Sequence, residues 1–207
     1  MRNKTGSVLM VLGLMLLVSA FALTAYNRWD EERANNVATE TVQVLLAKTP
    51  DLKLLDPDGE LIPNYLLDPR REMPIIQIDG KDYVGYIDIP VLDLSLPVME
   101  SWSYPNLKIS ACRFTGSVYH DDMVIAAHNY RWHFGGLKNL SVGDEVRFTD
   151  GDGNVFVFQV STVEQLFPTQ VEEMTESGWD LTLFTCTIGG QQRVTVRCTR
   201  VSEELVE

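Results

Sequence analysis

Three residues in the second half of the chain combine a reactive side chain with a position at the end of an apolar stretch. Cys186 closes the run LTLFTC, His128 follows MVIAA, and Arg193 opens RVTV after a glycine-containing loop. A thiol attacks as the thiolate and needs a base or cation nearby, because a free cysteine is mostly protonated at neutral pH. Histidine exchanges protons near neutral pH, and arginine donates hydrogen bonds to an oxyanion. The set indicates covalent catalysis through the thiol.

Other residues compete for two of these roles. Arg197 is four residues beyond Arg193, so strand alternation directs both to one face. It lies about 13 Å farther along the strand, which makes Arg193 the preferred oxyanion donor. His120 sits in the polar tract YHDD, and we expect it to be a solvated loop residue. His133, in RWHF, is expected either to pack in the interior or to lie on the rim of the site.

The elements that would position these residues are mainly β-strands. From Ile75 onward, short apolar stretches alternate with turn residues, which is typical of all-β proteins. The predicted strands are residues 75–78, 83–89, 94–99, 123–127, 145–149, 155–164, 182–185 and 193–201. Eight strands with few helices favour a closed barrel, because closing the sheet removes its exposed edges. Strand ends then converge around one mouth.

One polar tract allows two interpretations. The sequence Asp150-Gly-Asp-Gly lies between two predicted strands and predicts a hairpin turn. Asp150, Asp152 and Asn154 also match the opening of a calcium loop. That motif requires Gly at its sixth position and Glu at its twelfth, where this chain has Val155 and Ser161. We therefore interpret the tract as a turn and expect no metal site.

The N-terminal region predicts a membrane anchor. Residues 1–6 form a short tail with Arg2 and Lys4, and residues 7–26 follow without a charge. Twenty helical residues extend about 30 Å, the thickness of the hydrocarbon core. The basic flank predicts a cytoplasmic N-terminus and an extracellular remainder. A signal peptide cleaved near the Ala-Phe-Ala of residues 20–22 is the alternative, and both interpretations export the domain.

After the anchor we expect an extracellular helix and linker over residues 27–75 and one barrel domain over residues 76–207. Apolar residues recur at helical spacing between Trp29 and Lys48, and Pro50 ends the pattern. The formal charge of −12 argues against a nucleic-acid partner, because binding phosphates requires clustered Lys and Arg.

The three cysteines of an exported chain leave at least one thiol unpaired. Cys198 shares a strand face with Val194 and Val196, which predicts an interior, unreactive thiol. A Cys112–Cys198 disulfide would satisfy the parity of the count. Spacing does not establish that the two lie close together, so two buried thiols are the preferred interpretation and the disulfide is the alternative.

The reactive segments resemble the signature of the sortase family of cysteine transpeptidases. The tract Thr182-Leu-Phe-Thr-Cys186 matches a TLxTC strand, Arg193 opens the next strand, and Ala127-His-Asn129 stands upstream in the family's order. The tract DYVGYIDIP of residues 82–90 is also similar to the family's opening strands. The resemblance covers roughly residues 76–201 and implies a sortase-type closed β-barrel.

The resemblance also implies a mechanism and partners. Cys186 would attack a carbonyl in the C-terminal sorting signal of a surface protein, and Arg193 would stabilise the oxyanion. His128 would protonate the leaving amine and later deprotonate an incoming one. That amine would belong to a peptidoglycan precursor or a pilin, at the outer face of the cytoplasmic membrane. No metal or organic cofactor is implied, and Thr185 is a candidate for substrate binding.

The subclass stays open at this point. The juxtamembrane helix and the tract Ala-His128-Asn-Tyr favour a class B-like sortase, although the stretch from Pro168 to the TLFTC strand is short for that class. Asp68-Pro-Arg70 and the acidic end of the chain are unlike a pilus polymerase.

Three different functions compete with the transpeptidase. A papain-like hydrolase fits poorly, because there the cysteine precedes the histidine and sits on a helix. A membrane-anchored β-barrel binding module would use Cys186 only as a structural thiol. A sortase-like protein that hydrolyses its substrate without transferring it would carry the same three residues.

Overall fold

The computed structural model describes residues 4–49, 64–68, 70–176 and 178–201. Its helices are α1 (Lys4–Lys48), α2 (Asn64–Leu67), η2 (Pro90–Leu92), α3 (Tyr104–Leu107), η3 (Phe134–Asn139) and α4 (Val171–Thr175). Its strands are β1 (Ile76–Ile78), β2 (Lys81–Ile89), β3 (Leu94–Met99), β4 (Ala111–Thr115), β5 (Met123–Ala126), β6 (Glu145–Asp150), β7 (Val155–Leu166), β8 (Leu181–Cys186) and β9 (Arg193–Arg200). Most of the predicted linker lies outside the described residues.

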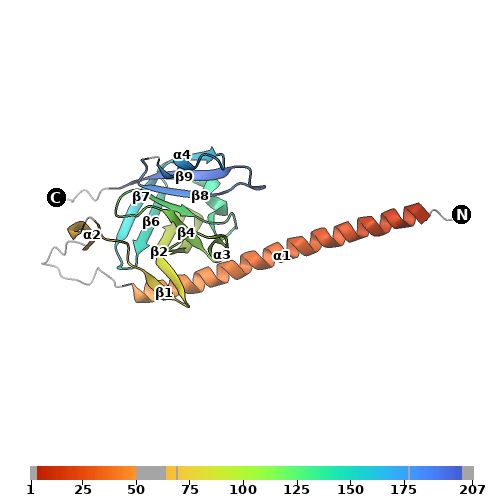
Figure 1. Ribbon diagram of the computed structural model, residues 1–207, viewed down its shortest axis with the longest axis horizontal. Helices are drawn as coiled ribbons and strands as arrows, with labels where there is room; N and C mark the ends of the chain where they lie inside the picture. The colour runs from red at the N-terminus through yellow and green to blue at the C-terminus, as the bar shows by residue number, and fades with distance from the viewer. Residues whose placement is uncertain (1–3, 50–63, 69, 177, 202–207) are drawn as a thin grey trace.

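Eight strands form a closed ring in the order β2-β3-β4-β5-β8-β9-β7-β6, and pairing of β6 with β2 closes it (Figure 1). The prediction of a closed eight-stranded barrel is therefore confirmed. One member of the ring differs from the prediction. Ala111–Thr115, which no sequence pattern marked, completes the ring as β4, whereas the predicted strand at residues 75–78 lies outside it as β1.

Closure of the ring depends on a close approach of β2 and β6 at Gly85. Gly85 has a φ of +149°, and a Cβ atom there would lie 2.0 Å from the carbonyl oxygen of Thr149. The register of β2 against β3 also shifts between Tyr83 and Gly85, which marks an irregularity in the strand. A glycine at this bulge lets the β6 backbone lie directly against β2.

The barrel wall separates two apolar cores. Inward side chains such as Ile87, Ile125 and Phe148 fill the interior of the barrel. Outward side chains such as Tyr83 form a second cluster with Leu45 of α1. The C-terminal half of α1 therefore covers the outside of the barrel beside β1, β2 and β3, as Figure 1 shows.

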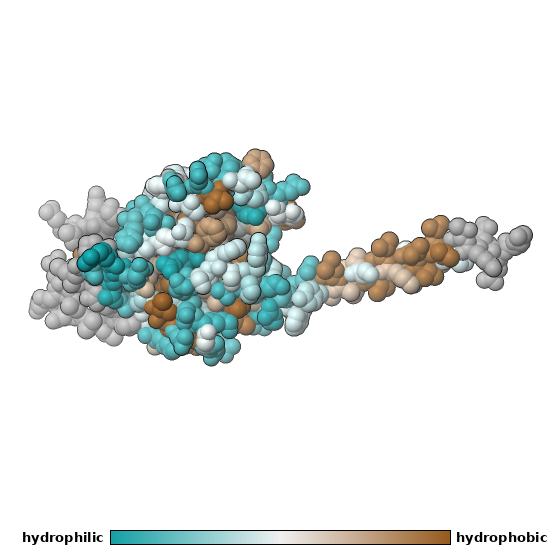
Figure 2. Space-filling view, viewed as in Figure 1, coloured by the Kyte–Doolittle hydropathy of each residue, from teal (hydrophilic) through white to brown (hydrophobic). Residues whose placement is uncertain are grey.

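Helix α1 is one continuous helix of 45 residues, where the sequence predicts an anchor helix and a separate extracellular helix. Its N-terminal half is apolar and exposed (Figure 2), and its most apolar window has the length and mean hydropathy (2.5) of a membrane span. In its C-terminal half, Ala34, Ala38 and Leu45 recur at helical spacing and are buried. The apolar segment is thus joined to the barrel by an uninterrupted helix.

The two buried cysteines are not bridged. Cys112 and Cys198 are both free thiols, and they belong to different apolar clusters, outside and inside the barrel wall. The preferred interpretation of two buried thiols is therefore confirmed, and the alternative of a disulfide is wrong, because the wall of the barrel separates the two sulfur atoms. The interior position predicted for Cys198 is confirmed.

The interpretation of residues 150–153 as a turn is confirmed, since they join the antiparallel strands β6 and β7. The carboxylate of Asp150 is fully buried and accepts hydrogen bonds from the backbone N–H groups of Asp152 and Asn154, both at 2.9 Å. It also accepts a hydrogen bond of 2.7 Å from the Tyr119 hydroxyl. Its oxygen atoms therefore serve to fasten the turn to the barrel.

Candidate active site

Strand register brings the three predicted catalytic residues to one end of the barrel. In the antiparallel pair β8–β9, Cys186 lies directly opposite Arg193. In the parallel pair β5–β8, Ala126 lies opposite Phe184. His128 is two residues beyond Ala126, and Cys186 is two residues beyond Phe184, so the two reach the same level of the barrel. Alternate residues share a face of the sheet, which places all three side chains on the same outer face.

Thr185 fastens the end of β8 to the residue that precedes His128. Its hydroxyl is buried and donates a hydrogen bond of 2.8 Å to the carbonyl oxygen of Ala127. The Ala127 N–H in turn donates to the Phe184 carbonyl oxygen at 3.3 Å. These bonds continue the β5–β8 pairing past the last residue of β5. Thr185 thus has a positioning role, and its contact with substrate stays a prediction.

Cys186 stands where β8 enters an exposed hairpin loop, and its side chain is partly exposed. A hydrogen bond of 2.9 Å between the first N–H and the last carbonyl oxygen closes the loop over residues 187–192. Gly189 and Gly190 adopt positive φ values of +87° and +74° at its tip. Glycine adopts this conformation without steric cost, and the tight turn returns Arg193 opposite the cysteine.

Arg193 is held over this loop. Its Nη1 atom donates hydrogen bonds to the carbonyl oxygens of Gly190 and Gln192, both at 3.1 Å. Both acceptors are main-chain atoms of the hairpin that begins at Cys186. The guanidinium is therefore held against the loop that joins Cys186 to Arg193, and its role as an oxyanion donor stays a prediction.

Arg197, the competing arginine, is a structural residue and only 2% exposed. Its guanidinium donates hydrogen bonds to the carboxylate of Glu164 at 2.8 Å, to the hydroxyl of Thr182 at 3.1 Å, and to the carbonyl oxygens of Glu173 at 2.6 Å and Met174 at 3.2 Å. These bonds tie β9 to β7, β8 and α4. Arg193 therefore remains the candidate oxyanion donor of the two, and that role stays a prediction.

His128 is partly buried at the mouth of the site. Burial lowers its pKa below the usual 6.5, the positive charge of Lys108 lowers the pKa further, and the negative charge of Asp30 opposes both. The imidazole stacks on Tyr130, with ring centroids 4.8 Å apart and planes at 28°. Its neutral form is favoured near neutral pH, which suits a group that has to accept a proton.

The other two histidines lie outside the catalytic set. His133 is 1% exposed, and neither ring nitrogen has a hydrogen-bond partner among the described residues. Burial lowers its pKa to about 4. His133 thus packs in the interior rather than on the rim of the site. His120 lies in the turn before β5, as predicted. Within the described part of the chain, no three His, Cys, Asp or Glu side chains gather as metal ligands would.

Sequence reasoning did not connect one acidic residue to the site. The hydroxyl of Tyr130 donates a hydrogen bond of 2.8 Å to the carboxylate of Asp30, 100 positions earlier in α1. Asp30 is buried and also forms an ion pair of 2.8 Å with Arg33. The helical pattern predicted the helix around Asp30, but no spacing rule signals a contact across 100 residues.

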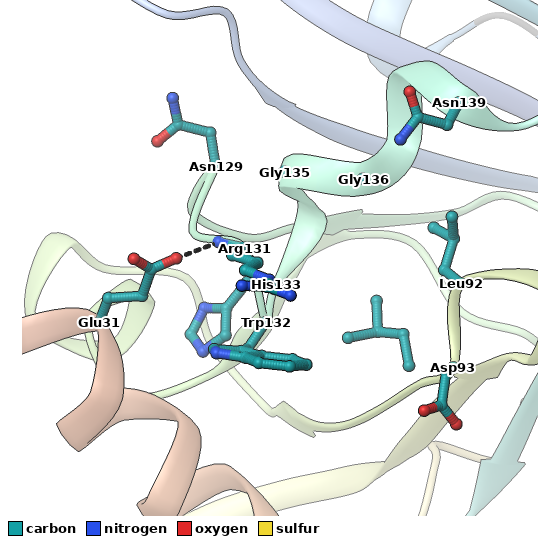
Figure 3. A pocket seen from close by; sticks show the side chains of 11 residues that line it. Glu31, Leu92, Asp93, Asn129, Arg131, Trp132, His133, Gly135, Gly136 and Asn139 are labelled. Atoms are coloured by element: carbon teal, nitrogen blue, oxygen red, sulfur yellow. Dashed lines mark hydrogen bonds between the residues drawn. The ribbon is translucent and has the colours of Figure 1, made fainter. Parts of the chain in front are cut away.

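A cavity of about 550 Å³ opens at the same barrel end, between α1 and the segment that follows His128 (Figure 3). Glu31 and Asp93 lie on opposite sides of it, with Trp132 between them. Glu31 also accepts a hydrogen bond from the Arg131 N–H, as the dashed line in Figure 3 marks. Cys186 is not among the residues that line this cavity.

Comparison with known proteins identifies one family. The model of the Sortase domain family matches residues 87–201, more than half of the chain. The chain is 24% identical to sortase A of Bacillus anthracis over 185 residues, which cover 86% of this chain and 83% of that relative.

Solved structures agree in fold. Sortase C1 of Streptococcus agalactiae is 27% identical, with a TM-score of 0.53 over 62% of this chain and 72% of that one. A sortase D5 transpeptidase of Clostridium perfringens is 18% identical, with a TM-score of 0.58 over 81% of this chain and 99% of that one. Because these relatives belong to classes A, C and D, the class B-like assignment stays a prediction.

Proposed function

This chain belongs to the sortase family, and we propose that it cleaves a C-terminal sorting signal through a thioester on Cys186 and transfers the acyl group to an amine. The observation that carries this proposal is the strand register that sets Cys186 opposite Arg193 and beside His128. A thiol, a proton-transfer group and a cation on one face are the groups that acyl transfer through a covalent intermediate needs.

In the first half of the reaction, the Cys186 thiol gives its proton to His128, the resulting thiolate attacks the scissile carbonyl carbon, and the C=O electron pair moves to oxygen. Arg193 donates hydrogen bonds to that oxyanion, and its own bonds to the loop carbonyls keep it in place. An oxyanion donor of this kind contributes about 10²–10³-fold to kcat. The C–N bond then breaks as His128 gives a proton to the leaving amine, and the acyl group remains as a thioester.

In the second half, an incoming amine attacks the thioester carbon, His128 accepts its proton, and the thiolate leaves. The lowered pKa of His128 favours the neutral imidazole, which is the form that this step uses. We propose a surface protein with a sorting signal as the acyl donor. The acceptor is an amine of a peptidoglycan precursor or of a pilin.

We propose that the N-terminal half of α1 anchors the enzyme in the cytoplasmic membrane, with the N-terminus inside and the barrel outside. Residues 7–26 carry no charge, and Arg2 and Lys4 precede them. Basic residues on the short flank of a span favour its cytoplasmic side. This orientation holds the barrel at the outer surface, where both substrates are found.

The test uses the full-length protein in detergent micelles with a library of quenched sorting-signal peptides, with and without an amine acceptor, followed by intact mass. We expect a thioester adduct that is absent in Cys186→Ala and retained in Cys112→Ala, and a product that contains the amine. An adduct released only by water would make the protein a hydrolase. If a general thiol reagent labels Cys186 but no peptide does, a binding role replaces the transpeptidase.

A further inference from the structure

The segment that carries His128 out of β5 is held in place by helix α1. Residues 128–133 form neither strand nor helix. Two consecutive residues of this segment are bound by two consecutive residues of α1: Tyr130 donates to Asp30 at 2.8 Å, and the Arg131 N–H donates to Glu31. The path of the chain after the catalytic histidine is therefore set by the helix that bears the membrane span.

The acceptor in this contact is itself rigidly held. Asp30 is 7% exposed, and each of its carboxylate oxygens has a partner: Oδ1 accepts from Arg33, and Oδ2 accepts from Tyr130. Both hydrogen bonds lower the pKa of Asp30, so the carboxylate is ionised at neutral pH. A buried, ionised and doubly bonded carboxylate is a fixed point to which the tyrosine is attached.

Tyr130 connects Asp30 to His128. Its ring stacks on His128 at 4.8 Å, and its other neighbour is His133, at 5.3 Å and 49°. The phenol ring is thus held at its hydroxyl by α1 and forms the surface against which the His128 imidazole rests. A shift of the hydroxyl moves this surface and with it the plane of the imidazole.

We propose that Asp30 and Tyr130 are positioning residues for His128, so that the membrane-bearing helix sets both the orientation and the electrostatic environment of the catalytic histidine. The inference rests on the proposed function in one respect, namely that His128 is catalytic. The contact itself rests only on the hydrogen bond and the stacked rings.

The charged and titratable groups that face His128 come from four directions. Asp30 acts from α1, Lys108 from the end of α3, and Tyr130 and His133 from its own segment. Cys186 lies beside it on β8 by register. Because Asp30 is the acidic member of this group, loss of its charge leaves Lys108 unopposed.

Two variants separate geometry from charge. Asp30→Asn removes the charge but keeps an oxygen that accepts from Tyr130. Tyr130→Phe keeps the stacked ring and the charge but removes the hydrogen bond. Glu32→Gln is the matched control, because it removes a charge from an exposed position in the same turn of α1. All are made in the full-length chain in micelles, with thermal unfolding as the test of folding.

The readouts are kcat and KM for acyl transfer and the NMR titration of the histidine ring protons, which is tractable because the chain has three histidines. In Tyr130→Phe we expect kcat to fall roughly tenfold with KM within about twofold, and the His128 titration to stay in place. In Asp30→Asn we expect the midpoint of the His128 titration to move to lower pH.

Wild-type kcat in Tyr130→Phe, or the same titration of His128 in Asp30→Asn as in Glu32→Gln, would overturn the inference. If the wild-type protein transfers no acyl group, the proposed function fails, and the titration alone then decides whether α1 controls His128. If Tyr130→Phe does not fold, the comparison of Asp30→Asn with Glu32→Gln decides.

Discussion

Arg193 and Arg197 lie on the same face of β9, yet their side chains are held differently, and two substitutions test the separate roles that we propose for them. Arg193→Ala removes a partly exposed side chain whose hydrogen bonds go to carbonyls of its own hairpin. Arg197→Ala removes a side chain that is 2% exposed and joins β9 to three neighbouring elements. We expect the first to slow acyl transfer strongly in a stable protein and the second to destabilise the barrel.

The magnitudes follow from the partners that each substitution leaves behind. Removing one member of a buried ion pair costs about 3–5 kcal/mol. The side chain of Glu164, the carboxylate partner of Arg197, is 40% exposed, so water compensates part of its loss. We therefore expect Arg197→Ala to lower the free energy of unfolding by about 3 kcal/mol. Arg193→Ala leaves only loop carbonyls without a donor, and we expect less than about 1 kcal/mol.

The assay pairs thermal unfolding, followed by tryptophan fluorescence, with the rate of thioester formation well below both melting temperatures. Arg193→Ala should melt like the wild type and form the thioester about 10²–10³-fold more slowly. Arg197→Ala should melt earlier and react within a few-fold of the wild type while folded. A stable Arg197→Ala protein without thioester formation would refute this assignment and make Arg197 the oxyanion donor.

Three further predictions concern reactivity, pH and the hairpin turn. In the folded protein, iodoacetamide should label Cys186 but neither Cys112 nor Cys198, because both are fully buried and burial raises the pKa of each to about 12; intact mass before and after unfolding checks this. The pKa of His133 falls from 6.5 to about 4 on folding. The contribution of this group to the free energy of unfolding is therefore complete above pH 6.5, and about 3 kcal/mol of it is lost as the pH falls towards 4. Denaturant unfolding against pH should show this loss in the wild type and a smaller one in His133→Phe. Asp150→Ala should lower the free energy of unfolding by about 3 kcal/mol, because buried donors lose their acceptor; an unchanged melting temperature would contradict this.

That the three candidate catalytic residues lie at one end of the barrel could be predicted, because the position of each follows from local pattern. Cys186, His128 and Arg193 all stand at the boundary between an apolar stretch and a loop, and strand ends meet when a sheet closes. The order of the strands in the ring could not be predicted. It depends on the parallel pairing of β5 with β8, which joins segments far apart in the sequence, Met123 opposite Leu181.

Strand β4 shows why alternation was insufficient. Ala111 belongs to the interior core and Cys112 to the outer cluster, and both are fully buried. The strand is thus covered on both faces at its start, and the partly buried Arg113 and the exposed Thr115 follow, so its short sequence shows no clear alternation of apolar and polar residues. Arg197 illustrates the converse case. Alternation correctly set it on the face of Arg193, but α4 covers that part of the face and takes its hydrogen bonds.

The continuity of α1 has a consequence for where the site opens. Residue 26 ends the uncharged stretch and Asp30 follows four residues later, about 6 Å along the helix. Asp30 accepts a hydrogen bond from Tyr130 in the segment that follows His128. At the other end of the helix, Lys48 donates a hydrogen bond to the carbonyl oxygen of Gln77 in β1. The catalytic end of the barrel is therefore the end nearest the apolar half of α1, and the β8–β9 loop points the same way in Figure 1. In the proposed orientation, the barrel end that carries Cys186 is therefore the end nearer the membrane.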